Sequence, residues 1–166
     1  MKGESLKTWF FRQGMNVYPM FFGTGGRVEF LSRDWKQVRV RLKLGLWTYN
    51  YAGTIFGGSM FSAIDPFYMV LLVNILGRDY IVWDKAGTIA FKKPGRSKIT
   101  ANISYTDEDI KTILENVSRD GRYQFDKSVD WTDQDGHVIS TVTKTVYVAT
   151  KAHYKKRQLE RALKKT

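Results

Sequence analysis

The longest apolar segment of the sequence, residues 59–76, sets the tightest limit on the fold. It is long enough for about five helical turns, and apolar residues occupy nearly all of its circumference. A helix of this kind should be buried on every side. Its apolar run, PFYMVLLV followed by NIL, is too short to cross a bilayer, so we expect a core helix and no membrane span. The rest of the chain must therefore wrap around one helix.

Most of the remaining sequence alternates apolar and polar residues, which predicts β-strands with one buried face. In the first strand, Val28 and Phe30 should share a face. An Asp-Gly pair at residues 135–136 predicts a hairpin between the last two strands. The six expected strands lie within residues 27–35, 37–46, 80–94, 97–106, 122–133 and 137–151.

Three further helices are expected outside this pattern. One covers residues 4–13 and is followed by a loop; one follows Thr106 as its cap and ends at Gly121; the third lies in the tail. The sequence thus predicts one α+β domain over residues 1–166, in which an antiparallel sheet wraps around the central helix. Its core covers about residues 25–150, and residues 151–166 form a basic helical tail that docks on the surface through Leu159 and Leu163. Pairing of an exposed edge strand with a second copy would give a homodimer, or a dimer of dimers.

Composition removes several classes of function. The chain has no cysteine and two histidines, which excludes thiolate chemistry and argues against a metal centre. Its net charge of +11 invites a nucleic-acid-binding interpretation, but residues 151–166 hold seven of the 27 basic residues and one of the 16 acidic ones. Without this tail, 20 basic and 15 acidic residues remain, and no nucleic-acid motif is present. We therefore expect a cytoplasmic protein that does not bind nucleic acid; a nucleic-acid-binding module is the weakest alternative.

One stretch, NYAGTIFGGSMFSAID, combines features that the fold alone does not require. Gly57 and Gly58 at a helix start would let a carbonyl group approach free backbone amides, which can hold an oxyanion. Asp65, seven residues after Gly58 in the same expected helix, could act as a general base. Asn50 could orient water or substrate. Pro66 should bend the helix beside this acid.

Each of these residues also has a structural interpretation. The glycine pair could form a turn or a close helix–strand contact. Asp65 could cap a helix that begins at Pro66. Asn50 could belong to a turn. It is the joint spacing that favours a site.

That spacing resembles the motif of hotdog-fold acyl-CoA thioesterases of the phenylacetate-pathway type, in which Asn-x-x-Gly-x-x-His-Gly-Gly precedes the catalytic acid by the same interval. The resemblance covers about residues 25–150, and the segments FGGSMFSAIDPFY, YIVWDKA and FKKPGR are most similar to an uncharacterised bacterial branch of that superfamily. The chain departs from the motif at one position, because Phe56 stands where the thioesterases commonly have histidine.

The resemblance implies a hotdog fold and an acyl-CoA thioesterase with its site at a dimer interface. Asp65 would be the general base or nucleophile, Gly57 and Gly58 the oxyanion hole, and Asn50 a positioning residue. No metal or prosthetic group is implied, and coenzyme A enters as part of the substrate. A hotdog protein that binds an acyl ligand without hydrolysing it is the alternative. The resemblance also implies substrate-binding residues. Phe56 would belong to an apolar acyl pocket, and Asp84 and Thr88 would lie on a strand that passes the neighbouring subunit's site. Lys92, Lys93 and Arg96 would bind the coenzyme A phosphates; the alternative is that these three basic residues belong to a solvated turn.

Overall fold

A six-stranded antiparallel sheet forms the body of the protein in a computed structural model that describes residues 3–163. The strands follow the order β1-β2-β4-β5-β6-β3, so β1 and β3 are the two edges. β4 and β5 pair only at Thr100 with Thr132 and Ala101 with Trp131, and beyond this point the sheet opens. The strands are β1 (Arg27–Leu31), β2 (Gln37–Leu42), β3 (Tyr80–Phe91), β4 (Ile99–Ser104), β5 (Arg122–Thr132) and β6 (Val138–Thr150).

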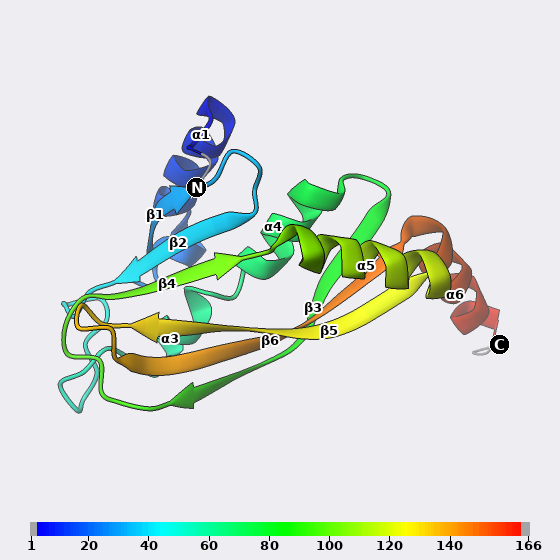
Figure 1. Cartoon of the computed structure of the whole chain (residues 1–166). Helices are drawn as coiled ribbons and strands as arrows, with labels where there is room; N and C mark the ends of the chain where they lie inside the picture. The colour runs from blue at the N-terminus through cyan, green and yellow to red at the C-terminus, as the bar shows by residue number, and fades with distance from the viewer. Residues whose placement is uncertain (1–2, 164–166) are drawn as a thin grey trace.

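The predicted central helix lies against this sheet in two pieces, α3 (Gly57–Ser62) and α4 (Phe67–Leu76) (Figure 1). The break falls at the residues before α4, as expected from Pro66, which has no amide hydrogen to donate. By length and composition alone, the 20 residues from Gly57 to Leu76 could cross a membrane. In this fold, however, they supply the centre of the hydrophobic core.

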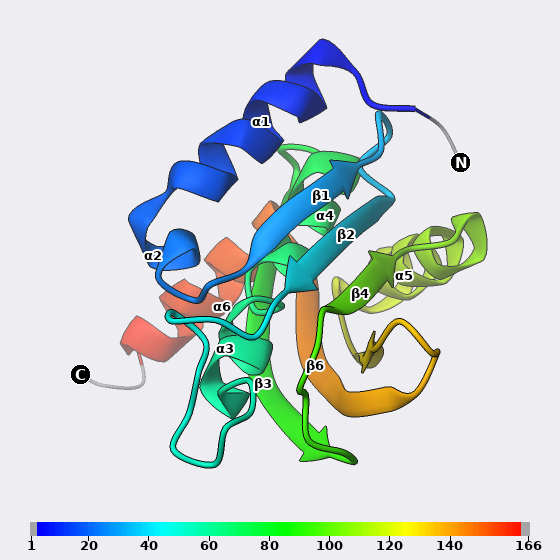
Figure 2. The same cartoon turned by 90° about the vertical axis from the view of Figure 1, so that its left-hand side faces the viewer.

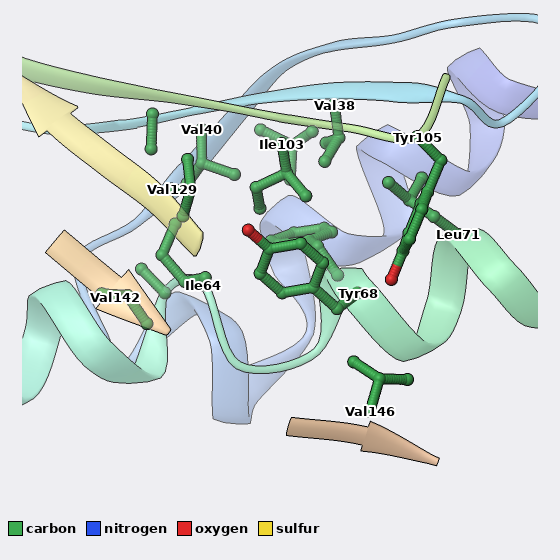
Figure 3. Packing of buried hydrophobic residues seen from close by; sticks show 14 of the residues in the cluster. Val38, Val40, Ile64, Tyr68, Leu71, Ile103, Tyr105, Val129, Val142 and Val146 are labelled. Atoms are coloured by element: carbon green, nitrogen blue, oxygen red, sulfur yellow. The ribbon is translucent and has the colours of Figure 1, made fainter. Parts of the chain in front are cut away.

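The core lies between α3–α4 and the curved sheet, and Figure 3 shows how it is filled. Side chains of the central helix meet side chains of β2 and β4 on one side and of β6 on the other. The labelled examples are Ile64, Tyr68 and Leu71 from the helical segment, Val38, Val40 and Ile103 from β2 and β4, and Val142 and Val146 from β6. This arrangement confirms that the most apolar segment of the sequence is the element around which the others pack.

Four further helices surround this core. α1 (Leu6–Val17) and α2 (Pro19–Phe22) lie beside β1, and α5 (Asp107–Asp120) lies on the other side, near β4 (Figure 2). The sequence predicted α1 and α5, including the Thr106 cap and the stop at Gly121. α2 was expected to be a loop; Pro19 instead occupies the first turn of a short helix, a position that proline tolerates.

The tail forms α6 (Lys151–Leu163), as predicted, and its last three residues lie outside the described part of the chain. Its docking surface differs from the expected one. Leu159 and Leu163 are exposed, whereas His153 and Tyr154 are the partly buried residues near its start. The His153 ring fills the space above Gly121, so the side chain that anchors α6 is an imidazole and not a leucine.

Two irregularities change which strand residues face the core. In β1 the register shifts between Val28 and Phe30, so that Val28 and Leu31 are the buried residues, and the predicted pairing of Val28 with Phe30 on one face is wrong. In β3 the register shifts between Asp84 and Ala86, which makes Lys85 an extra residue. Such a bulge reverses the alternation of all following residues.

Candidate functional site

Asp65 lies in the turn that separates α3 from α4, and its carboxylate binds a buried lysine. The Nζ atom of Lys144, on β6, lies 2.5 Å from Asp65 Oδ1 and 3.1 Å from Asp84 Oδ2 on β3. The lysine side chain is 4% exposed, Asp84 is 18% exposed and Asp65 is 54% exposed. The helical segment and two strands thus contribute one charged group each, and the outermost group is the predicted catalytic acid.

The two inner groups of this network have shifted pKa values. Burial raises the pKa of the Asp84 carboxyl; Lys144 opposes this effect and the charge of Asp65 adds to it, so the pKa stays above its ordinary value. Burial alone would lower the pKa of Lys144, but its bonds to Asp65 and the charge of Asp84 outweigh burial and raise it. Lys144 is therefore held as an ammonium ion. Asp84 Oδ1 has no hydrogen-bond partner among the described residues.

Local sequence explains how the lysine fits into the core. Gly87 lies opposite Lys144 in the β3–β6 ladder, and a Cβ atom at Gly87 would meet the Phe61 ring at 2.8 Å and Lys144 Cδ at 3.0 Å. The Lys144 ammonium lies 5.3 Å from the centre of the Phe61 ring. The bulge at Lys85 allows Asp84 and Gly87 to face the helical segment together, which regular alternation would forbid.

Lys144 is the functional candidate that sequence reasoning missed. The signal was present in the alternation of β6, because Val142, Lys144, Val146 and Val148 fall on one face of the strand. Three of these residues are fully buried valines, so a lysine among them needs a buried acid as its partner.

α3 begins at the glycine pair, as the prediction of an oxyanion site assumed. Gly57 and Gly58 are its first residues, Phe56 is its N-cap, and no side chain caps the free amides. The Phe56 ring is 56% exposed and occupies the position that a Cβ atom at Gly58 would need. From the sheet, the Trp131 indole donates a hydrogen bond of 2.9 Å to the Met60 carbonyl, which fixes α3 against β5.

Asn50 has the role that its structural interpretation predicts. Its Oδ1 atom accepts hydrogen bonds from the amides of Ala52 and Thr54, each at 3.0 Å, and its Nδ2 atom donates to Thr54 Oγ1 at 2.9 Å. The side chain therefore closes the turn at residues 50–54. The alternative in which Asp65 caps a helix is contradicted, because no side chain caps α4 and the Asp65 carboxylate binds Lys144.

The motif residues line two separate cavities. Asn50, Gly57 and Met60 line a cavity of about 430 Å³ beside the turn at residues 91–95. Asp65 lines another of about 500 Å³, together with Ser59, Ser62 and residues of α1 and α2. Gly57 and Met60 share one side of α3, and Ser59 and Ser62 share the opposite side, so within a single copy Gly57 and Asp65 line different cavities.

The predicted substrate-binding residues are likewise distributed. Lys92 and Lys93 line the first cavity, beside Gly57, and Arg96 is exposed at the same turn but does not line it. Asp84 faces Lys144, whereas Thr88 pairs with Thr143 on the opposite face of the sheet. The bulge at Lys85 separates these two residues, which the sequence had placed together.

A group of metal-ligand types lies elsewhere, at the β5–β6 hairpin. Asp133, Asp135 and His137 come within 4.8 Å of one another there. The Asp133 carboxylate accepts hydrogen bonds from the amides of Asp135 and His137, which lower its pKa against the opposing effect of burial. These turn contacts account for the cluster without an ion.

A long antiparallel sheet wrapped around one apolar helix defines the hotdog fold, which is the fold of the thioesterase superfamily. Several solved structures are similar to this chain in fold. A Pseudomonas aeruginosa protein of unknown function, PA5026, described as a "Probable Thioesterase", superposes with a TM-score of 0.75 at 19% identity over 89% of this chain and 98% of that one. The Haemophilus influenzae thioesterase HI1161 superposes with a TM-score of 0.62 at 13% identity, over 90% of this chain and 93% of that one. Thioesterase superfamily member 2 from Mus musculus superposes with a TM-score of 0.60 at 16% identity, over 86% of this chain and 98% of that one.

Within this fold the family can be stated more narrowly. The chain belongs to the family described as a domain of unknown function, DUF4442, whose model matches residues 7–148. No curated protein matches the chain in sequence. The predicted hotdog fold is therefore confirmed, and the chain's family is one of unknown function, in agreement with the predicted uncharacterised branch.

Proposed function

We propose that this protein is a homodimeric hydrolase of acyl thioesters, with acyl-CoA as its substrate and Asp65 as the general base or nucleophile. The observation that carries the proposal is the ion pair of Asp65 with the buried Lys144 beside a cavity. A carboxylate that is half exposed, and held from behind by a fixed cation, can reach a substrate in a defined direction. Lys144 would be a positioning residue that acts through Asp65.

The site we propose is completed by a second copy. In one chain Gly57 and Asp65 line two different cavities. β3 is an edge strand of 12 residues, and pairing of two such strands would continue the sheet and bring two central helices side by side. The acid of one copy could then face the glycine amides of the other.

The chemistry follows from these groups. Asp65 would take a proton from water while the water oxygen attacks the thioester carbonyl, and the amides at Gly57 and Gly58 would hold the developing oxyanion. As the C–S bond breaks, the proton held by Asp65 would pass to the leaving thiolate, giving a carboxylic acid and a free thiol. If Asp65 attacks directly, water would instead hydrolyse an acyl–carboxylate intermediate to the same products.

Substrate binding would use the first cavity and its rim. Phe56, Ile55 and Met60 give this region apolar surface for an acyl chain, and Lys92, Lys93 and Arg96 offer cations to the phosphates of coenzyme A. We propose no further cofactor. A cytoplasmic location, where acyl-CoA is available, belongs to the same proposal.

The test is a hydrolysis screen over acyl-CoA chain lengths that measures free thiol, on the wild type and on Asp65→Asn. We expect turnover of at least one chain length and a loss of about a hundredfold or more in Asp65→Asn. Asp126→Asn, on the exposed face of the sheet, is the matched control and should retain full activity. Equal activity of wild type and Asp65→Asn, both folded, would refute the role of Asp65.

One observation favours a second candidate, an acyl-ligand-binding protein without catalysis. Phe56 places an exposed apolar ring at the start of α3, and this ring cannot donate a hydrogen bond to a thioester carbonyl. Saturable binding of an acyl-CoA without release of thiol, in protein that is folded and dimeric, would support this function over hydrolysis.

A further inference from the structure

Between α6 and the sheet lies a cavity whose lining differs from that of either site cavity. Its volume is about 320 Å³, within the range of small-molecule sites. Three of its seven lining residues are the cations Lys85, Arg122 and Arg157, and none is a carboxylate. The remaining four, two tyrosines and two glutamines, all carry groups that can donate hydrogen bonds.

This cavity lies on the face of the sheet that points away from the central helix. Tyr147 alternates with the core residues Val146 and Val148, and Gln124 is its partner across the β5–β6 ladder. The site is therefore distinct from the Asp65 network, which faces the helical segment. It is also separate from the cations at the end of β3, because Lys85 and Lys92 are seven residues apart, roughly 23 Å along a strand.

Lys85 reaches this cavity from the bulge in β3. Lys85 is the extra residue of the bulge, and its ammonium lies 5.0 Å from the centre of the Tyr147 ring. Regular alternation from Trp83, which pairs with Tyr147, places Lys85 on this face, opposite to Asp84, and the bulge shifts only the residues that follow.

The position of α6 over the cavity is fixed at its first turn. The Thr150 amide donates to the Gly121 carbonyl and the Lys151 amide donates to the Asp79 carbonyl, each at 3.0 Å. The His153 ring packs directly over Gly121. Tyr154 and Arg157, three residues apart on α6, consequently share the helix face that lines the cavity.

The cations of the cavity have no acidic partner of their own. Among residues 3–163, none of Lys85, Arg122 and Arg157 forms an ion pair with a carboxylate. Asp120, two residues before Arg122 in the chain, forms its ion pair with Arg119 at 2.9 Å, and the charge of Arg122 acts on it from further away. Three positive charges around one small cavity whose lining holds no carboxylate favour a ligand with two or more negative charges.

We infer that this cavity is a binding site for a small phosphorylated molecule that carries a diphosphate group. Arginine recognises phosphate oxygens through paired donors, and two arginines with a lysine suit two adjacent phosphoryl groups. The tyrosine hydroxyls and glutamine amides would supply further donors. This inference does not depend on the proposed hydrolase function, because it uses none of its residues.

The experiment is a calorimetric titration of the full chain with inorganic pyrophosphate. We expect saturable binding of one pyrophosphate per chain in the wild type, and about tenfold weaker binding for each charged contact removed, in Arg122→Gln and in Arg157→Gln. The matched controls are Lys155→Gln and Lys156→Gln, which remove the same charge from exposed positions of α6 that do not line the cavity, and they should bind within about twofold of wild type. A parallel titration with ADP identifies the source, since tighter binding than pyrophosphate indicates a nucleotide and equal binding a free diphosphate.

Two results would overturn the inference. The first is no saturable binding of pyrophosphate at millimolar concentration by wild-type protein. The second is equal weakening by the arginine variants and by the lysine controls, which would reduce the effect to net charge. Lys85→Gln, on a strand rather than on α6, repeats the test without touching the helix, and unchanged binding in this variant would also refute the site as drawn.

Discussion

Lys144 and Asp65 form a 2.5 Å ion pair across the boundary between the core and the solvent. The lysine is almost fully buried and the aspartate is half exposed, while Asp84 supplies the second carboxylate from within. The pair therefore joins the inside of the sheet to the surface of the central helix. Lys144 neutralises Asp84, and this requirement for stability also places a cation behind the candidate catalytic acid.

The first prediction concerns the stability of this network. Lys144→Met should lower the free energy of unfolding by about 3 to 5 kcal/mol, because it leaves the largely enclosed Asp84 carboxyl without its cation. Adding Asp84→Asn should recover most of this loss, since the uncompensated charge is then gone. Urea unfolding of the two single variants and the double variant measures the coupling. Additive effects would show that the two groups are independent.

The same variants separate positioning from stability in the proposed reaction. In Lys144→Met/Asp84→Asn, which should be folded, we expect kcat for acyl-CoA hydrolysis to fall about tenfold or more while KM changes little, because Asp65 loses its fixed direction. Lys111→Met, on the exposed surface of α5, is the control for removal of a lysine charge. A double variant with the wild-type kcat would limit Lys144 to a structural role.

Alternation and apolar character were enough to predict the fold, because they decide which elements can be buried. The all-round apolar segment became α3 and α4, and the alternating segments became the six strands. The site was less accessible from sequence. The bulge at Lys85 cannot be read from periodicity, yet because of it Thr88 does not share the face on which Asp84 meets the helical segment. Spacing along the chain also could not show that Gly57 and Asp65 line different cavities.

The glycine that ends α5 gives a prediction about the attachment of α6. Gly121 has a φ of +73°, and a Cβ atom there would overlap the His153 ring. Gly136, in the hairpin turn, has a φ of +82° with no atom within 4 Å of such a Cβ, so it is a matched control. Gly136→Ala should cost about 1 kcal/mol for the left-handed backbone alone. Gly121→Ala should cost more, and His153→Ala should remove the excess; equal costs in thermal unfolding would contradict this contact.

The last prediction uses pH to test the cap of α5. Burial alone would raise the pKa of Asp109, but hydrogen bonds from Lys127, at 2.6 Å, and from the Thr106 amide, at 2.7 Å, outweigh it and hold the pKa below its ordinary value. A carboxyl with a lowered folded-state pKa stabilises the fold above its unfolded-state pKa of about 3.9, and this stability is lost as pH falls below that value and through the folded-state pKa.

Asp109→Asn should therefore be less stable than wild type near neutral pH, and the difference should shrink steadily as the pH is lowered below about 4. Urea unfolding at a series of pH values measures it, with Glu108→Gln, the neighbouring exposed acid in the same turn, as the control. The helix dipole favours both acids, so a small loss is expected in the control as well. A difference between Asp109→Asn and wild type that stays constant down to acid pH would mean that the bonds to Lys127 and Thr106 do not depend on the charge of Asp109, and that the cap acts by geometry alone.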